Sequence, residues 1–445
     1  MIRINRKNNN KPDIGFEGKY VQSCIITSIM FLFIFGWKFT SFLDIILFTS
    51  LFFCLYFFLH NGRFSKIAVN YILLLSVPLI YGLIITSLKG SVDLQFIFRT
   101  TRAIINLLGS YIFVCIYRKK YGEFAKNTIL KDLEICLLLH AVLMFFMYIN
   151  KDFAFSIYEI TGKATDRGSI LLGNRVSGLT YALSQLSVIQ MWGGIIIIYN
   201  YFYNNQVSKN GLVLIAKISV IIFSILVSGR TGILFGVFLL PISFISFMIR
   251  GNRKNRAKIL KILISIVFVI LILNSINLLS LLPDKFSAYT LMRLNDVFTF
   301  IKTGESSVFE QVKNFWTVVP DNTLDFLFGT SSLGRSEYLF IDSDPGLNKI
   351  LFAVGLVGSI LYYIPTFYSI IIIARMMKGN RELSIVALFI IISNFVLNFK
   401  ELAIYTRNQW SIITIVFFLL CSENTVMHKT DANNYNIKNV EEVSS

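Results

Sequence analysis

The chain has 445 residues, of which 55% are hydrophobic and 15% charged, and its formal net charge is +17. Soluble domains carry about 25% charged residues, so this composition excludes an ordinary soluble enzyme. The positive charge does not indicate nucleic-acid binding, because the cytoplasmic loops of membrane proteins carry an excess of lysine and arginine. The apolar runs are continuous rather than alternating, which excludes a transmembrane β-barrel.

Apolar runs long enough to cross about 30 Å of hydrocarbon recur along the chain. The first follows a basic tail and is interpreted as a retained helix, because no small-residue cleavage site follows it. The runs predict about twelve transmembrane helices, near residues 20–37, 40–59, 67–88, 101–117, 129–149, 177–200, 212–228, 232–249, 259–282, 346–374, 383–399 and 403–421. The predicted fold class is an all-α polytopic membrane protein.

Lysines and arginines gather at alternate ends of these helices. They occupy the N-terminal tail (1–19) and the turns around residues 63–66, 118–126, 250–256 and 375–381. With twelve spans these segments all fall on one side, and the positive-inside rule places that side and both termini in the cytoplasm. Helices one to nine then occupy residues 20–282, helices ten to twelve occupy 346–421, and 422–445 form a polar, disordered tail.

The one long polar segment between helices is the loop over residues 283–345, which this topology places outside. Its charge balance is opposite to that of the chain, with five basic and nine acidic residues. Apolar residues spaced three and four apart between 308 and 319 predict an amphipathic helix on the membrane surface or against the helix bundle. The loop ends in FGTSSLGRSEYLFIDSDPGLNKI, where Arg335, Glu337, Asp342 and Asp344 fall within ten residues.

Arginines on the outer face run against the orientation rule, so each needs a partner or a ligand. Arg230 lies in the short turn VSGRTGIL, whose glycines permit close approach of a ligand. The other candidates are Arg99 and Arg102 at the start of the fourth helix, and Arg167 and Arg175 around the loop segment GSILLGN. Such a set suits a phosphate-rich ligand, because guanidinium groups bind phosphate in a bidentate manner. The alternative is that each arginine snorkels, caps a helix end or contacts lipid headgroups.

Carboxylates near the end of the large loop are candidates for a general base that accepts a proton from a sugar hydroxyl. Asp344 is the first candidate, ahead of Glu337 and Asp342, and its structural alternative is to cap the helix that follows. No histidine competes, because His60, His140 and His428 fall in a cytoplasmic turn, inside a helix and in the tail. None of the five cysteines has metal-ligand spacing, so no metal or other cofactor is predicted.

Taken together, the chain resembles the O-antigen polymerase (Wzy) family of bacterial polysaccharide assembly, within the O-antigen ligase and polymerase superfamily. SGRTGIL resembles the Ser/Gly-Arg-Thr-Gly segment of that family. LFGTSSLGRSEYLFIDSDPGLNKILFAVGLVGSILYY resembles the end of its large loop, with a Phe-Gly-Thr turn, an aspartate and a helix that begins near a Gly-Leu pair. Some members carry an arginine followed eleven positions later by glycine in two outer loops, as Arg167–Gly178 and Arg335–Gly346 do here.

The resemblance implies a glycosyltransferase in the cytoplasmic (inner) membrane of a bacterium. A growing glycan on undecaprenyl pyrophosphate would be transferred to the next lipid-linked repeat unit of an O-antigen, capsule or exopolysaccharide, on the outer face. Arg230, Arg335 and Arg167 would hold the pyrophosphate first, with Arg175, Arg99 and Arg102 around them, and Trp316 and Tyr338 would stack on sugars. A chain-length regulator and a flippase are the partners implied by the resemblance.

Three other functions remain open from the sequence. An O-antigen ligase shares the architecture, but the ligases compared with this chain carry a histidine in the large outer loop, which it lacks. A lipid-linked oligosaccharide flippase or other transporter would place charges inside its helices near the membrane midplane, and few are found there. A structural scaffold would have no need of arginines on the outer face.

Overall fold

The structure is a computed structural model. It describes residues 16–38, 44–60, 62–91, 93–161, 175–180, 182–250, 318–333 and 345–422, the strand residues 335–336 and 339–340, and the isolated positions 257, 299 and 302–304. The predicted ninth helix (259–282) and the predicted amphipathic helix (308–319) lie outside these residues, except that 318 and 319 are described and are not helical.

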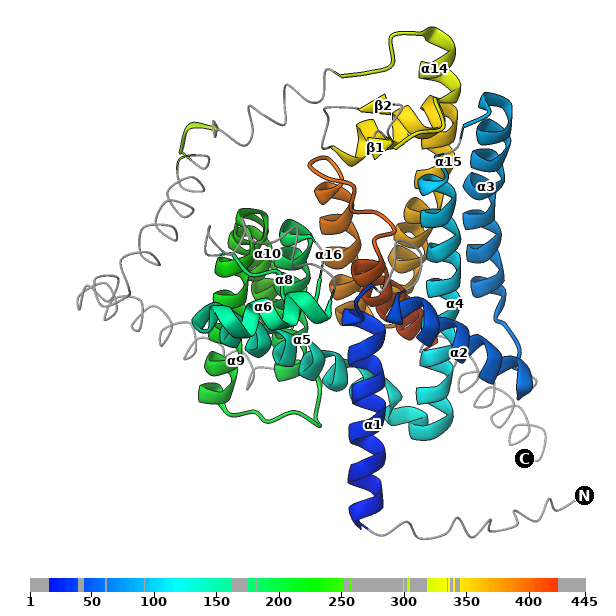
Figure 1. Cartoon of the computed structure of the whole chain (residues 1–445). Helices are drawn as coiled ribbons and strands as arrows, with labels where there is room; N and C mark the ends of the chain where they lie inside the picture. The colour runs from blue at the N-terminus through cyan, green and yellow to red at the C-terminus, as the bar shows by residue number, and fades with distance from the viewer. Residues whose placement is uncertain are drawn as a thin grey trace, which may run out of the picture.

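Within the described residues the fold is helical, apart from one short strand pair (Figure 1). The long helices are α1 (Phe16–Phe35), α2 (Ile45–Leu59), α3 (Lys66–Lys89), α4 (Gln95–Tyr121), α5 (Ala125–Ile149), α8 (Leu183–Tyr203), α9 (Gly211–Ser228), α10 (Arg230–Arg250), α15 (Gly346–Met376) and α16 (Arg381–Leu397). A last helix covers residues 407–422. The short elements are η1 (Gly122–Phe124), α6 (Lys151–Ile160), α14 (Thr323–Phe328) and the antiparallel strands β1 (Arg335–Ser336) and β2 (Leu339–Phe340).

The described helices are compatible with a multi-pass membrane protein. Six helical segments are long and apolar enough to cross a membrane: Lys66–Lys89, Gln95–Ile149, Leu183–Tyr203, Gly211–Ser228, Arg230–Phe247 and Gly346–Met376. Their outward faces expose large apolar side chains such as Leu73, Phe146 and Ile371. Soluble proteins rarely expose contiguous apolar surface on this scale, whereas a lipid bilayer covers it.

Helix α8 lies at the centre of the fold and is buried over nearly its whole length. It packs against α5, α9, α10 and α16, and the indole N–H of Trp192 donates to Ser393 Oγ on α16 at 2.7 Å. A helix surrounded by protein in a membrane must satisfy its polar side chains internally. Trp192 therefore ties α8 to the C-terminal helices that carry part of the site.

Two helices begin about six residues from their predicted starts, and one short helix lies where the sequence predicts a loop. Helix α4 begins at Gln95 rather than near 101, because Asp93 Oδ1 accepts the Gln95 N–H at 3.0 Å. Helix α8 begins later than predicted, at Leu183, and residues 177–180 form a turn. Helix α6 was expected as part of a loop; Asn150 caps it by accepting the Phe153 N–H at 2.9 Å.

The end of the large loop is fixed to the helices by an anchor segment, residues 325–333, above the ends of α3 and α15 (Figure 1). Helix α15 is interrupted at Gly355 (φ 66°, ψ −173°), and the N–H groups of Thr330 and Ser331 donate to Phe352 O (2.6 Å) and Ala353 O (2.9 Å). The interruption frees carbonyl groups that the anchor segment then satisfies. Asp93, before α4, accepts from Ser332 Oγ at 2.8 Å and holds the other side of the segment.

Gly355→Ala is expected to release the anchor segment and lower the folded yield in membranes. A Cβ at Gly355 would lie 2.4 Å from the backbone of Leu327, and the glycine-only conformation adds about 1–3 kcal/mol of strain. Gly90→Ala is the matched control, because Gly90 also has positive φ (59°) but nothing lies within 4 Å of the added Cβ. Thermal unfolding in detergent is the measurement, and equal losses for both variants would contradict the packing argument.

Candidate functional site

The candidate site lies at one end of the helices, where α1, α9 and α16 end and α4, α8, α10 and the last helix begin. This end is called the site end below. At its centre is the loop of residues 398–406, which joins α16 to the last helix and buries Ala403, Ile404 and Tyr405. Buried loops require internal partners for their backbone groups, so this loop is a fixed part of the fold.

Polar side chains supply those partners to the 398–406 loop. Asn398 Oδ1 accepts the N–H groups of Ala403 (3.0 Å) and Ile404 (3.3 Å). Tyr362 Oη donates to Ile404 O at 3.1 Å, and Tyr405 Oη donates to the backbone oxygen of Tyr362 at 3.0 Å. Tyr405 itself has φ of 60°, a left-handed conformation that persists only where the surroundings enforce it.

Arg99 on α4 positions the same loop. Its guanidinium donates to Ile404 O at 2.8 and 3.2 Å and to Leu402 O at 3.0 Å. The sequence predicts Arg99 as a pyrophosphate ligand, and in the structure its Nε and Nη2 donate to backbone carbonyls. Gln185 at the start of α8 also donates to Leu402 O, at 3.1 Å.

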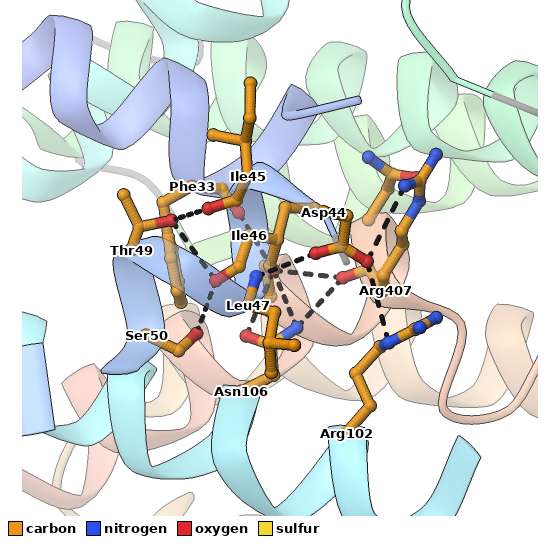
Figure 2. Close-up of polar contacts among 12 residues, drawn as sticks. Phe33, Asp44, Ile45, Ile46, Leu47, Thr49, Ser50, Arg102, Asn106 and Arg407 are labelled. Atoms are coloured by element: carbon orange, nitrogen blue, oxygen red, sulfur yellow. Dashed lines mark hydrogen bonds and ion pairs between the residues drawn. The ribbon is translucent and has the colours of Figure 1, made fainter. Parts of the chain in front are cut away.

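Four charged residues form the Asp44 cluster: Lys38, Asp44, Arg102 and Arg407. Figure 2 shows Asp44 with Arg102 and Arg407. Asp44 is fully buried, and its Oδ1 caps α2 by accepting the Leu47 N–H at 2.7 Å. Its Oδ2 lies 3.5 Å from Arg102 Nε and 3.7 Å from Arg407 Nη1. Burial lowers the pKa of the Lys38 ammonium, and the nearby Arg407 and Arg102 lower it further. The cluster is therefore rich in positive charge.

The first turn of the last helix holds Arg407 in this cluster. Asn106 Nδ2 on α4 donates to Arg407 O (3.1 Å) and to Ser411 Oγ (3.0 Å), and Asn408 Nδ2 donates to Ile34 O of α1 at 2.6 Å. Sequence reasoning missed Lys38, Asp44 and Arg407 as site residues. The run Arg407-Asn408-Gln409 inside an apolar stretch was the available signal, because polar groups within a span usually face protein or a cavity.

Three further cations form the Arg230 cluster: Arg175, Arg230 and Lys400. Arg230 is the first residue of α10, and Gly229 alone separates it from α9. Arg175 is close to this turn, because its neighbour Val176 donates its N–H to Val227 O near the end of α9. Burial and then the charge of Arg230 lower the pKa of the Arg175 guanidinium. Lys400 Nζ donates to Thr231 Oγ1 at 2.7 Å, which brings the start of the 398–406 loop to the same place.

Close packing builds the turn that presents Arg230. The Gly232 N–H donates to Ser187 Oγ of α8 at 2.9 Å, and a Cβ at Gly232 would lie 2.5 Å from Ser187. The Val176 N–H donates to Val227 O at 3.2 Å, which joins the segment that carries Arg175 to the end of α9. The predicted short turn at SGRTGIL is thus confirmed, and its glycines allow helices α8 and α10 to approach closely.

His140 supports the Arg175 segment from below. It lies inside α5, as predicted, and is fully buried. Its Nε2 accepts the Leu179 N–H at 3.1 Å, and the ring stacks on Phe35 of α1 with centroids 4.0 Å apart. Gly178 (φ 51°) packs directly on this ring. Through these contacts the His140 imidazole fixes the position of residues 175–180.

Of the remaining predicted site residues, the structure describes Arg335 alone. Arg335 begins β1, where it pairs with Phe340 of β2. Residues outside the described part of the chain are Arg167, Trp316, Glu337, Tyr338, Asp342 and Asp344. Among the described residues, no group of three or more histidine, cysteine, aspartate or glutamate side chains is arranged to hold a metal ion.

No model of a known protein family matches the sequence, and a search of curated proteins finds no match either. The structure brings Arg99, Arg102, Arg175 and Arg230 to one end of the helices, as the sequence predicts, and adds Lys38, Lys400 and Arg407.

Proposed function

We propose that this protein polymerises lipid-linked polysaccharide repeat units, by transferring a growing glycan from undecaprenyl pyrophosphate to the next unit. The observation that carries the proposal is the Arg230 cluster. Arg230 lies on a tight glycine turn, the segment that carries Arg175 is bonded to the end of α9 beside that turn, and Lys400 reaches Thr231 next to Arg230. The charge of Arg230 lowers the pKa of the Arg175 guanidinium. Like charges held together favour an anion of high charge, and a diphosphate matches paired guanidinium groups.

The proposal includes the topology expected from the sequence, with twelve spans and both termini in the cytoplasm. Basic residues in the last turns of α4 (Arg118, Lys119, Lys120) and α15 (Arg375) lie at the helix ends opposite the site end. The positive-inside rule makes that opposite end cytoplasmic. The site end then faces outward from the cytoplasmic membrane of a bacterium, where lipid-linked units are assembled into polymer.

In the proposed reaction, the bond between the anomeric carbon of the growing glycan and the diphosphate oxygen breaks. A hydroxyl oxygen of the acceptor sugar bonds to that carbon, and its proton passes to a carboxylate, for which we propose Asp344, with Glu337 and Asp342 as alternatives. Arginines that bind the diphosphate stabilise the charge that develops as it leaves. Arg335 and Arg167 would complete the diphosphate site, and Trp316 and Tyr338 would stack on sugars.

A deletion strain tests the proposal directly. Lipid-linked and surface glycans are separated on a gel before and after complementation with the wild-type gene. We expect single repeat units in the deletion strain and a ladder of polymer after complementation. A ladder that persists without the gene would overturn the proposal. An absence of lipid-linked units from the outer face would instead favour the flippase, and polymer that remains on its lipid carrier would favour the ligase.

A further inference from the structure

The cations of the site end fall into two groups rather than one. Arg407 and Asp44 belong to the Asp44 cluster, whereas Lys400 reaches Thr231 in the Arg230 cluster. The 398–406 loop connects the two clusters along the chain. It is fixed between α4 and α8 by hydrogen bonds from Arg99 and Gln185 to Leu402 O. The 398–406 loop, which is fixed by these hydrogen bonds, therefore lies between the Asp44 cluster and the Arg230 cluster along the chain.

Arg407 carries unused donors in a buried position. Its side chain is only 7% exposed, and within the described part of the chain neither Nη1 nor Nη2 has a hydrogen-bond acceptor. Asp44 Oδ2 is also buried and accepts no hydrogen bond from those residues. Buried charged groups are almost always hydrogen-bonded, so unused donors here indicate a position for a ligand.

The contacts to Asp44 are ion pairs rather than hydrogen bonds. The distances of 3.5 Å to Arg102 and 3.7 Å to Arg407 exceed the usual range for N–H···O bonds. Lys38 lies within electrostatic range of Arg407, Arg102 and Asp44. Among the described residues, Asp44 thus leaves the Nη donors of Arg407 without a hydrogen-bond acceptor. Figure 2 shows the two guanidinium groups on either side of Asp44.

We propose that the Asp44 cluster is a second diphosphate site, which holds the diphosphate of the acceptor unit while the Arg230 cluster holds that of the donor. The inference rests on the proposed function, because a polymerase of this kind binds two diphosphate-linked chains in each cycle. Asp44 acts as the exchangeable counter-ion of Arg102 and Arg407 between cycles. The 398–406 loop fixes the spacing of the two substrates.

The test is the stoichiometry of binding of farnesyl diphosphate, a short prenyl diphosphate, to the full-length protein in phosphatidylcholine nanodiscs. Isothermal titration calorimetry is expected to give about two sites in the wild type and about one each in Arg407→Gln and Arg230→Gln. Asp44→Asn is expected to tighten binding at one site by about tenfold, because it removes a like charge from beside the ligand. Asparagine preserves the cap of α2, so this variant tests the site without loss of the fold.

Loss of one site alone separates the inference from the proposed function. If the wild type has one binding site, and that site is lost in Arg230→Gln but kept in Arg407→Gln, the second site is overturned. The proposed polymerase function is then unaffected. No binding at all overturns both. If phosphatidylglycerol in the nanodisc abolishes only the Arg407-dependent step, the cluster binds a lipid headgroup and the acceptor assignment is wrong. Asp44→Asn without tighter binding also contradicts the inference, even if Arg407→Gln does not fold.

Discussion

Arg230→Ala is expected to abolish the polymer ladder in the complemented deletion strain and leave single repeat units. The side chain lies at the first residue of α10 beside Arg175, where it would bind the departing diphosphate. Removal of one group that stabilises developing charge lowers a rate by about 100- to 1000-fold. Arg230→Lys is expected to restore only part of the ladder, because an ammonium group lacks the bidentate geometry of guanidinium.

The matched control for this prediction is Arg381→Ala. Arg381 is the first residue of a helix, as Arg230 is, but it is exposed and begins α16 at the opposite end of the helices. We expect this variant to produce the wild-type ladder. Both variants must reach the membrane in equal amounts by immunoblot. A wild-type ladder from Arg230→Ala at equal protein level would show that the Arg230 cluster is not needed for polymerisation. It would therefore contradict the polymerase proposal.

The sequence predicted the helices better than it predicted their contacts. Apolar length and the basic turns depend on local composition, so α3, α9 and α15 begin within two residues of the predicted positions. The position of Arg230 at a helix end was also predictable, because a charged side chain between glycines in a short turn must lie close to the membrane boundary. These features require no knowledge of which helices are neighbours.

The Asp44 cluster depends on neighbours, and the sequence therefore did not reveal it. Arg102 and Arg407 are about three hundred positions apart and meet only because α4 packs beside the last helix. Arg99 also makes contacts between segments that are far apart in the sequence. Its position at a helix start suggested a ligand, but the carbonyl groups it binds belong to a loop 303 and 305 residues further along the chain. Spacing within one helix cannot show that a side chain is already used.

Glu134→Ala is expected to produce a large loss of folded protein. Glu134 on α5 is buried, and its Oε1 accepts from Lys217 Nζ of α9 at 2.5 Å while Oε2 accepts from Asn200 Nδ2 at 2.7 Å. Removal of one partner of a buried ion pair leaves the other charge uncompensated, at a cost of about 3–5 kcal/mol. Size-exclusion chromatography of the detergent-solubilised protein is the measurement, and an unchanged monodisperse yield would contradict the prediction.

Two comparison variants isolate the effect of burial at this pair. Asp325→Asn breaks an ion pair of similar length, Lys89–Asp325 at 2.6 Å, but both side chains are partly exposed, at 39% and 26%, so the change should stay below about 1 kcal/mol. Glu134→Gln with Lys217→Met removes both charges together and should restore the folded yield, because no charge is left unpaired.

The double variant also separates the polymerase from the transporter alternative. An ion pair inside the helices is one of the features by which transporters move charge or protons. If the pair only stabilises α5 against α9, Glu134→Gln with Lys217→Met restores the polymer ladder together with the folded protein. If the folded variant leaves lipid-linked units on the cytoplasmic side, the pair takes part in transport, and the cations of the site end would then bind a diphosphate in transit rather than during transfer.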